Sequence, residues 1–242
     1  MKIYAVGIGP GDLDYLTPKA QEIILGCDVI VGYTKYIELI ADIIKDKEVI
    51  STGMTGETAR CESAFAEAAK GKKVAVVSSG DAGIYGMASL LYELSEKYPG
   101  VEIEVIPGVT AAVSAASILG SPLSNDFAAV SLSDLMTPWE VIEKRLAAAA
   151  AGDFVVCLYN PQSTKRSDYI KRACNIMLEY KPPETCCGYV KNALRGNQGI
   201  SRLCILRELP DADIDMLTTV IIGNSATRII GGKLVAARGY KI

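Results

Sequence analysis

The chain has 242 residues, 50% of them hydrophobic, which is enough for packed cores in one large domain or two ordinary ones. Its formal net charge of -3 argues against a general nucleic-acid binder, and the lack of any histidine excludes His-based acid/base catalysis, His metal ligands and Ser-His-Asp triads. No apolar run reaches the about 18 residues that a membrane span needs, and the N-terminus is typical of a strand entering a turn. We therefore expect a cytoplasmic protein with no signal peptide.

In the first half, apolar β-branched runs alternate with helical patterns. Thr17 can cap a helix that has Pro18 in its first turn and Gly26 after its end. Strands followed by helices are typical of a parallel α/β sheet. The predicted strands are 3–6, 29–31, 49–51, 74–77 and 101–106, and the predicted helices are 18–25, 36–44, 58–70, 86–97 and 110–119.

In the second half, little helix separates the last strands, which favours a mixed sheet with antiparallel strands. Thr137 and Glu140 predict a capping box for a helix that begins at Pro138. A turn-rich stretch at 120–126 predicts the boundary between domains 1–120 and 121–242. The predicted strands are 128–132, 154–158, 186–190, 203–206, 219–222 and 234–236; the predicted helices are 138–150, 167–179 and, weakly, 192–196.

Seven cysteines are scattered along the chain without CxxC spacing, at positions 27, 61, 157, 174, 186, 187 and 204. An odd number without such spacing is typical of reduced thiols in a cytosolic protein. A soft metal site is the alternative, and the spacing gives it little support, so we expect no protein-bound metal.

Three glycine-rich loops directly follow predicted strands, at 7–12, 78–86 and 107–112. Small ligands bind at the carboxyl edge of open α/β sheets, so the loops predict a trough for a small polar molecule. The first loop lacks the third glycine of a dinucleotide fingerprint, and no P-loop lysine follows it. Asp81 can bind a ligand ammonium or hydroxyl, or cap the following helix. The N–H groups near Thr110 can hold a carboxylate or an adenine edge, or Thr110 is an ordinary cap.

Further candidates lie in the second half. Asn160 ends an apolar strand, and the loop after it carries Lys165 and Arg166, which bind acidic groups or are simply solvated. Gly223 ends another apolar strand, where a flat ligand can approach the backbone or a turn is formed. Asp134 and Ser133 are candidate catalytic groups, whereas Trp139 is expected to pack in the core.

At these residues the chain resembles the tetrapyrrole methylase family, the class III S-adenosylmethionine-dependent methyltransferases. The matching motifs are VGIGPGD, SSGDAGIYGMA, PGVTAA and TTVIIGN, which occur in order along the whole length. The stretches VGYTKYIELI, LSDLMTPWEVIEKRL and LYNPQSTKR resemble members that act at C17 of precorrin-3B or cobalt-factor III in cobalamin biosynthesis. The resemblance implies C17 methylation coupled to ring contraction, two α/β domains with the cofactor in a cleft between them, and a homodimer.

The resemblance also implies which residues contact S-adenosylmethionine: Pro10, Ser79, Gly80, Asp81, Ile84, Thr110, Ala111, Asn160, Ala193 and Gly223. The acceptor is an anionic tetrapyrrole, so binding it needs local cations and polar groups. The candidates are Lys35, Asp126, Lys165, Arg166, Lys191, Arg195 and Arg228. Ring contraction needs a proton carrier, for which Asp81, Tyr85, Tyr33, Asp126 and Asp134 remain open. Similar enzymes have His-Asp-Phe where this chain has Asn125, which keeps only a positioning role.

Several alternatives remain. A sister corrin methylase acting at C11 or C20, a diphthine synthase or an rRNA ribose methylase would keep the cofactor and change the substrate, although an RNA enzyme would be more basic. A nucleotide-binding oxidoreductase conflicts with the incomplete dinucleotide fingerprint. A sensor that binds S-adenosylmethionine without turnover is compatible with the sequence, and a purely structural interaction protein leaves the three loops unexplained.

Overall fold

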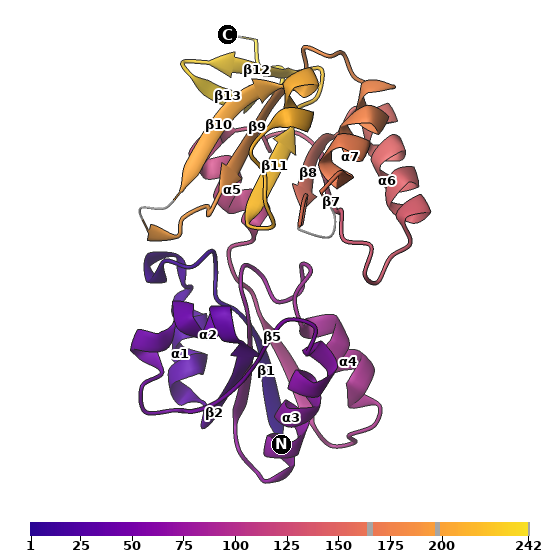
Figure 1. The fold of residues 1–242 in the computed structure, drawn as a ribbon. Helices are drawn as coiled ribbons and strands as arrows, with labels where there is room; N and C mark the ends of the chain where they lie inside the picture. The colour runs from indigo at the N-terminus through magenta and orange to yellow at the C-terminus, as the bar shows by residue number, and fades with distance from the viewer. Residues whose placement is uncertain (164–166, 197–198, 242) are drawn as a thin grey trace. The chain divides into compact units, whose positions relative to one another are not determined.

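A computed structural model describes residues 1–163, 167–196 and 199–241. The chain divides into two compact units, Met1–Thr110 and Ala111–Ile242 (Figure 1). Both are α/β, as the sequence predicts. The boundary lies ten residues before the expected one, because α5 (Ala111–Leu119) packs its alanines onto the second sheet.

The first unit is built on a five-stranded parallel sheet of order β3-β2-β4-β1-β5. Its apolar strands are covered on both faces, which is typical of parallel sheets. Helices α1 and α2 pack on one face with residues such as Val6 and Ile30, and α3 and α4 pack on the other with Ile3 and Val31. The elements are β1 (Lys2–Gly7), η1 (Leu13–Tyr15), α1 (Pro18–Gly26), β2 (Val29–Tyr33), α2 (Thr34–Leu39), η2 (Ala41–Ile43), β3 (Glu48–Thr52), α3 (Glu57–Ala69), β4 (Val74–Ser78), α4 (Ala88–Ser95) and β5 (Glu102–Ile106).

The second unit contains a mixed five-stranded sheet of order β10-β9-β11-β8-β7 and a three-stranded sheet of order β12-β13-β6. Only β7 and β8 pair in parallel in the larger sheet, which confirms the expected mixed sheet. The elements are α5, β6 (Gly120–Ser121), β7 (Phe127–Ser131), α6 (Trp139–Ala151), β8 (Val155–Tyr159), α7 (Tyr169–Leu178), β9 (Cys186–Lys191), β10 (Ile200–Ile205), η4 (Leu206–Asp211), β11 (Thr218–Ile222), β12 (Thr227–Ile230) and β13 (Lys233–Ala236).

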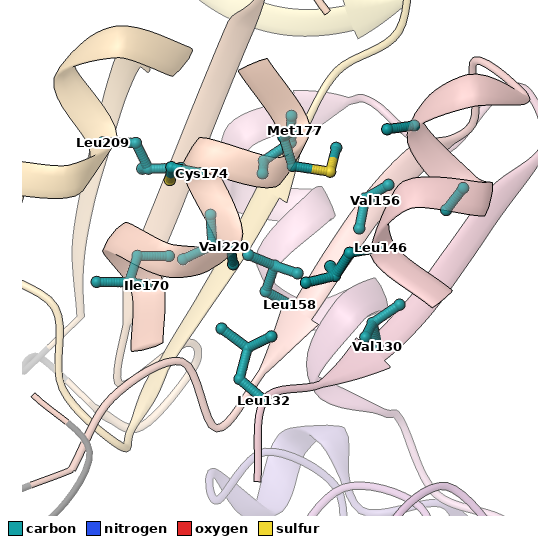
Figure 2. Close-up of a cluster of buried hydrophobic side chains, with 14 of the residues drawn as sticks. Val130, Leu132, Leu146, Val156, Leu158, Ile170, Cys174, Met177, Leu209 and Val220 are labelled. Carbon is teal, nitrogen blue, oxygen red and sulfur yellow. The ribbon is translucent and has the colours of Figure 1, made fainter. Parts of the chain in front are cut away.

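The core of the second unit lies between the larger sheet and the helices α6 and α7. Figure 2 shows Leu158 and Val220 of the sheet beside Leu146 of α6 and Ile170 and Met177 of α7. All five side chains are fully buried. The strand pairing decides which loops share an edge of this sheet.

Three local predictions differ from the structure. The helix expected at 36–44 is split, since α2 ends at Leu39 and a short 3-10 turn follows. Helix α6 begins at Trp139 with Pro138 as its cap residue and no side-chain cap, so the capping box expected from Thr137 is absent. The segment 192–195 forms turns rather than a helix.

No helix in the described part of the chain is long and apolar enough to cross a membrane.

Candidate functional site

The sheet order of the first unit places three glycine-rich loops side by side. They follow β1, β4 and β5, which are neighbours in the sheet and run in parallel, so all three loops leave the same carboxyl edge. Helix α1 follows β1 on one face, and α4 follows β4 on the other. Adjacent strands whose connections leave on opposite faces form a topological switch point, where open α/β sheets bind ligands. We call residues 7–12, 79–86 and 107–111 the loop cluster.

Glycines allow the loop cluster to pack backbone against backbone. Gly9 and Gly80 exchange two main-chain hydrogen bonds, of 3.0 and 2.7 Å. A Cβ on Gly108 would lie 2.2 Å from the Gly80 carbonyl oxygen, and a Cβ on Gly7 would lie 2.7 Å from the same oxygen. Neither position accepts a side chain without moving the backbone. The sequence prediction missed Gly7 and Gly108 as site residues, although Gly7 ends β1 and Gly108 lies two residues after the end of β5.

Asp81 ties two of these loops together. One carboxylate oxygen accepts hydrogen bonds from the backbone N–H groups of Gly83 (2.8 Å) and Ile84 (3.1 Å), and the other accepts from Gly108 (2.9 Å). Charge-assisted hydrogen bonds of this kind are stronger than neutral ones. These bonds form a turn within the loop rather than the expected helix cap, because α4 begins at Ala88 with Met87 as its cap residue and no side-chain cap. A contact of Asp81 with a ligand stays a prediction.

The groups that the loop cluster exposes fit the predicted cofactor. Ser79, Asp81, Thr110 and Ala111 are half-buried, and Ile84 is 42% exposed, whereas Pro10 and Gly80 are buried. S-adenosylmethionine presents an amino acid, ribose hydroxyls and a flat adenine, so its partners are main-chain donors and acceptors, hydroxyls and a small apolar surface. The loop cluster offers these groups.

In the second unit, Asn160 and Ala193 lie at one edge of the larger sheet. Strands β8 and β9 both run antiparallel to β11, so they end at the same edge, together with β7. Asn160 has a left-handed backbone (φ 50°) and donates from its amide to the Ser131 hydroxyl at 3.0 Å. Leu194, next to Ala193, has φ 54°, which is strained for a leucine. Strain of this kind at a strand end is typical of functional loops.

Gly223 does not belong with those residues. It follows β11 at the opposite edge, where its N–H donates to the carbonyl of Cys186 at the start of β9 (2.9 Å). A Cβ on Gly223 would lie 2.6 Å from that carbonyl oxygen, so its glycine is explained by packing. Because β11 is antiparallel to its neighbours, its carboxyl end lies at the opposite edge from those of β8 and β9.

Two of the predicted substrate residues also lie away from the edge with Asn160. Asp126 precedes β7, and its carbonyl accepts from Val155 at the start of β8 (3.1 Å). Arg228 is exposed on β12 of the small sheet. Asn125 donates to the Ala237 carbonyl at 2.8 Å; the positioning role expected of it in the reaction stays a prediction.

The remaining predicted cations have different surroundings. Lys191 is paired with Asp213 (3.1 Å) and Asp215 (3.2 Å), which raise its pKa. Its charge is thus already compensated. Lys35 is exposed at the start of α2, on the carboxyl edge of the first sheet, and Arg195 is half-buried after β9. Lys165 and Arg166 lie outside the described residues.

Contacts also narrow the choice of proton carriers. Asp134 accepts a hydrogen bond of 2.5 Å from the hydroxyl of Tyr169, and this bond raises the pKa of Tyr169. The tyrosine thereby anchors the loop after β7 against the α6–α7 side, where Trp139 is buried as expected. Tyr85 is 55% exposed with φ 54°, and Tyr33 is half-buried in an edge-to-face contact with Tyr36. The two tyrosines therefore remain the accessible candidates.

The sequence prediction also missed Arg60. Its side chain lies on the buried stripe of α3, with Cys61, Ala64 and Phe65, and it reaches the carboxyl ends of β2 and β3. A charged residue at helical spacing within an apolar stripe was the available signal.

Comparison with known proteins agrees with this geometry. Residues 2–206 match the family model "Tetrapyrrole (Corrin/Porphyrin) Methylases". The chain belongs to the tetrapyrrole methylase family. This membership makes it a methyltransferase by family, and it confirms the resemblance found in the sequence.

Named tetrapyrrole methylases cover the whole chain. A "Cobalt-factor III methyltransferase" of Priestia megaterium is 46% identical over 99% of this chain, which spans only 45% of that longer protein. A "Probable cobalt-factor III C(17)-methyltransferase" of Salmonella typhimurium is 44% identical over 98% of both chains. Among solved structures, "the methyltransferase CobJ" is 36% identical with a TM-score of 0.92, covering 98% of this chain and 99% of its own.

Proposed function

We propose that the protein transfers a methyl group from S-adenosylmethionine to C17 of cobalt-factor III, with contraction of the macrocycle, in cobalamin biosynthesis. The observation that carries the proposal is the 44% identity, over 98% of both chains, with a relative named for this activity. The intact loop cluster supports the cofactor. The relatives named for cobalt-factor III are 44–46% identical to this chain, so we place cobalt-factor III before precorrin-3B.

We propose that the loop cluster holds the cofactor, which contacts the half-buried Ser79, Asp81, Thr110 and Ala111 and the exposed Ile84. When bound, S-adenosylmethionine supplies an electrophilic methyl group and leaves as a neutral sulfide. The protein need not activate such a leaving group, so its main contribution is to hold the acceptor carbon about 3–3.5 Å from the methyl group. A site made of main chain and hydroxyls, with few titratable groups, is suited to that task.

We propose Tyr33 and Tyr85 as the residues that manage protons during ring contraction. Both lie at the carboxyl edge of the first sheet, at the end of β2 and in the loop after β4. A phenol can hold or pass a proton without a histidine. Replacing either tyrosine by phenylalanine should lower the rate of ring contraction and have a smaller effect on the Kd for S-adenosylmethionine.

The decisive experiment is anaerobic incubation of the purified protein with S-adenosylmethionine and cobalt-factor III, and separately with precorrin-3B. Release of S-adenosylhomocysteine together with a one-methyl mass gain in cobalt-factor III supports the proposal. Turnover of precorrin-3B alone would show that the substrate is the cobalt-free macrocycle. Tight cofactor binding without methylation of either would refute the substrate and leave a sister methylase or a sensor.

Homodimer formation and a cytoplasmic location remain predictions of the resemblance. Light scattering on the purified protein tests the first: a mass near twice the 25.8 kDa of the chain is expected. A mass of one chain would contradict it.

A further inference from the structure

Arg60 is a buried cation at the carboxyl edge of the first sheet. It lies in the first turn of α3 and is only 3% exposed. Its Nε donates to the Thr52 hydroxyl and one Nη donates to the Gly53 carbonyl, both at 3.0 Å, while the other Nη contacts the Met87 sulfur at 3.7 Å. The guanidinium also lies 6.0 Å from the ring centre of Tyr33. It therefore joins the ends of β2 and β3 to the loop after β4.

Every one of these partners is neutral. Among the described residues, none of the ion pairs involves Arg60, and Glu57, one turn earlier on the same helix, is exposed and takes part in none. A charge withdrawn from water without a counter-charge costs free energy, which an apolar side chain of similar size would avoid. Neutral acceptors alone do not explain why a full charge is kept here.

The charge lies under a surface that can receive a ligand. Gly53, whose carbonyl accepts from the guanidinium, is exposed, and so are the next two residues of the chain, Met54 (56% exposed) and Thr55. Tyr33 and Met87 beside them are half-buried. The loop cluster begins one strand away, at β4. A positive potential at this place therefore borders the proposed cofactor loops.

We infer that Arg60 determines substrate specificity by presenting an uncompensated positive charge to a carboxylate of the tetrapyrrole. This inference rests on the proposed function, since a carboxylate-bearing macrocycle is the substrate that the charge would recognise. Because Arg60 is only 3% exposed, it acts through the electrostatic potential at the surface beside Gly53 and Met87 and not by direct contact. The contrast with Lys191 is direct, because two aspartates already neutralise that lysine.

The inference separates a charge role from a purely structural one. Arg60→Met keeps most of the volume and removes the charge. Arg60→Lys keeps the charge and loses the planar fork that bridges Thr52 and Gly53. Glu57→Gln is the matched control, because it changes a charge one turn away on the same helix.

The test measures binding of uroporphyrin, a porphyrin with carboxylates on all its side chains, by fluorescence quenching at low and high salt. The assays are run at about pH 6.5, so that the partly buried lysine of Arg60→Lys stays protonated. We expect Arg60→Met to raise the Kd about tenfold at low salt and to flatten its salt dependence. Arg60→Lys and Glu57→Gln should stay within about threefold of the native Kd. The Kd for S-adenosylmethionine should be unchanged in all three, and thermal unfolding should show Arg60→Met folded and no less stable.

Other outcomes overturn the inference. If Arg60→Lys is as defective as Arg60→Met, the geometry of the fork matters and the charge does not. If Arg60→Met binds uroporphyrin like the native protein, or if the native protein does not bind it, no anion site is present. Turnover of cobalt-factor III by the native protein is measured in parallel. Its absence refutes the proposed function, whereas the porphyrin comparison still decides the role of Arg60.

Discussion

The closest packing in the first unit predicts that a single methyl group on Gly108 will disrupt the loop cluster. In Gly108→Ala the new Cβ would lie 2.2 Å from the Gly80 carbonyl oxygen and 2.7 Å from the backbone of Gly7. The first distance is about 1 Å short of van der Waals contact, and both neighbours are main chain that cannot rotate away.

The free-energy cost of Gly108→Ala depends on which main-chain groups must move to make room for the methyl group. Overpacking of this kind costs about 1–3 kcal/mol. Separating the loops also stretches the hydrogen bond from the Gly108 N–H to Asp81, and bonds to charged groups contribute about 1.5–3 kcal/mol. Because part of the strain is relieved when that bond breaks, we expect about 2–4 kcal/mol in total. A tenfold change in affinity corresponds to about 1.4 kcal/mol, so the Kd for S-adenosylmethionine should rise at least about tenfold.

Hydrogen exchange and calorimetry together check this prediction. Peptides covering 79–86 and 107–112 should lose amide protection in Gly108→Ala, while peptides from β8 and β9 in the second unit should not. Gly26→Ala is the matched control, because a Cβ there meets nothing within 4 Å at the end of α1, and alanine is the better helix former. Native-like protection and a cofactor Kd within twofold of the native value in Gly108→Ala would refute the reasoning.

Three further predictions follow from the contacts. Gly223→Ala should lower the stability of the second unit, because its Cβ would lie 2.6 Å from the Cys186 carbonyl oxygen. The Kd for S-adenosylmethionine, measured by titration calorimetry, should stay within twofold of the native value. A larger rise in Kd would return Gly223 to the cofactor site. Lys191→Ala should change the KM for the macrocycle less than about threefold in steady-state assays, since Asp213 and Asp215 already neutralise the lysine; a tenfold rise would contradict this. Burial raises the pKa of five thiols to about 11 or 12, so these thiols ionise at a lower pH in the unfolded chain than in the folded one. The free energy of unfolding should therefore fall as pH rises above about 9, by up to about 1.4 kcal/mol per pH unit for each thiol. A free energy of unfolding that stays constant between about pH 8 and 11 in urea titrations would contradict this. These thiols are Cys27, Cys61, Cys157, Cys174 and Cys204.

The sequence predicted the first unit well because its signals are local. Each strand of the parallel sheet is a short apolar run, and each loop of the cluster begins where such a run ends. Parallel strands place all their carboxyl ends on one edge, so loops far apart in sequence could be predicted to meet without knowing the strand order. The Gly9–Gly80 bridge and the Asp81–Gly108 hydrogen bond are the result.

In the second unit, the direction of each strand could not be predicted from the sequence. Asn160 and Gly223 each follow an apolar strand, and nothing in either run tells a parallel strand from an antiparallel one. The pairing of β11 with β8 is antiparallel, so these two residues lie at opposite edges. The small strands β6 and β12 were also missed, because two to four residues carry too little periodicity to predict a strand.

The composition gives the net charge but does not show where cations are available to bind a substrate. A net charge of -3 requires that any site for a carboxylate-rich macrocycle gather its cations locally. Of the cations chosen from the sequence, Lys191 lies between two aspartates. Arg60, which the sequence reasoning did not select, is the buried cation whose contacts in the described residues are all neutral. A cation's potential depends on its counter-charges and burial, and both are set by tertiary packing. A cation that attracts an anionic substrate should lie where the fold places no counter-charge beside it. Substitution of Arg60 is therefore a more informative test of how this methylase recognises its substrate than substitution of Lys191.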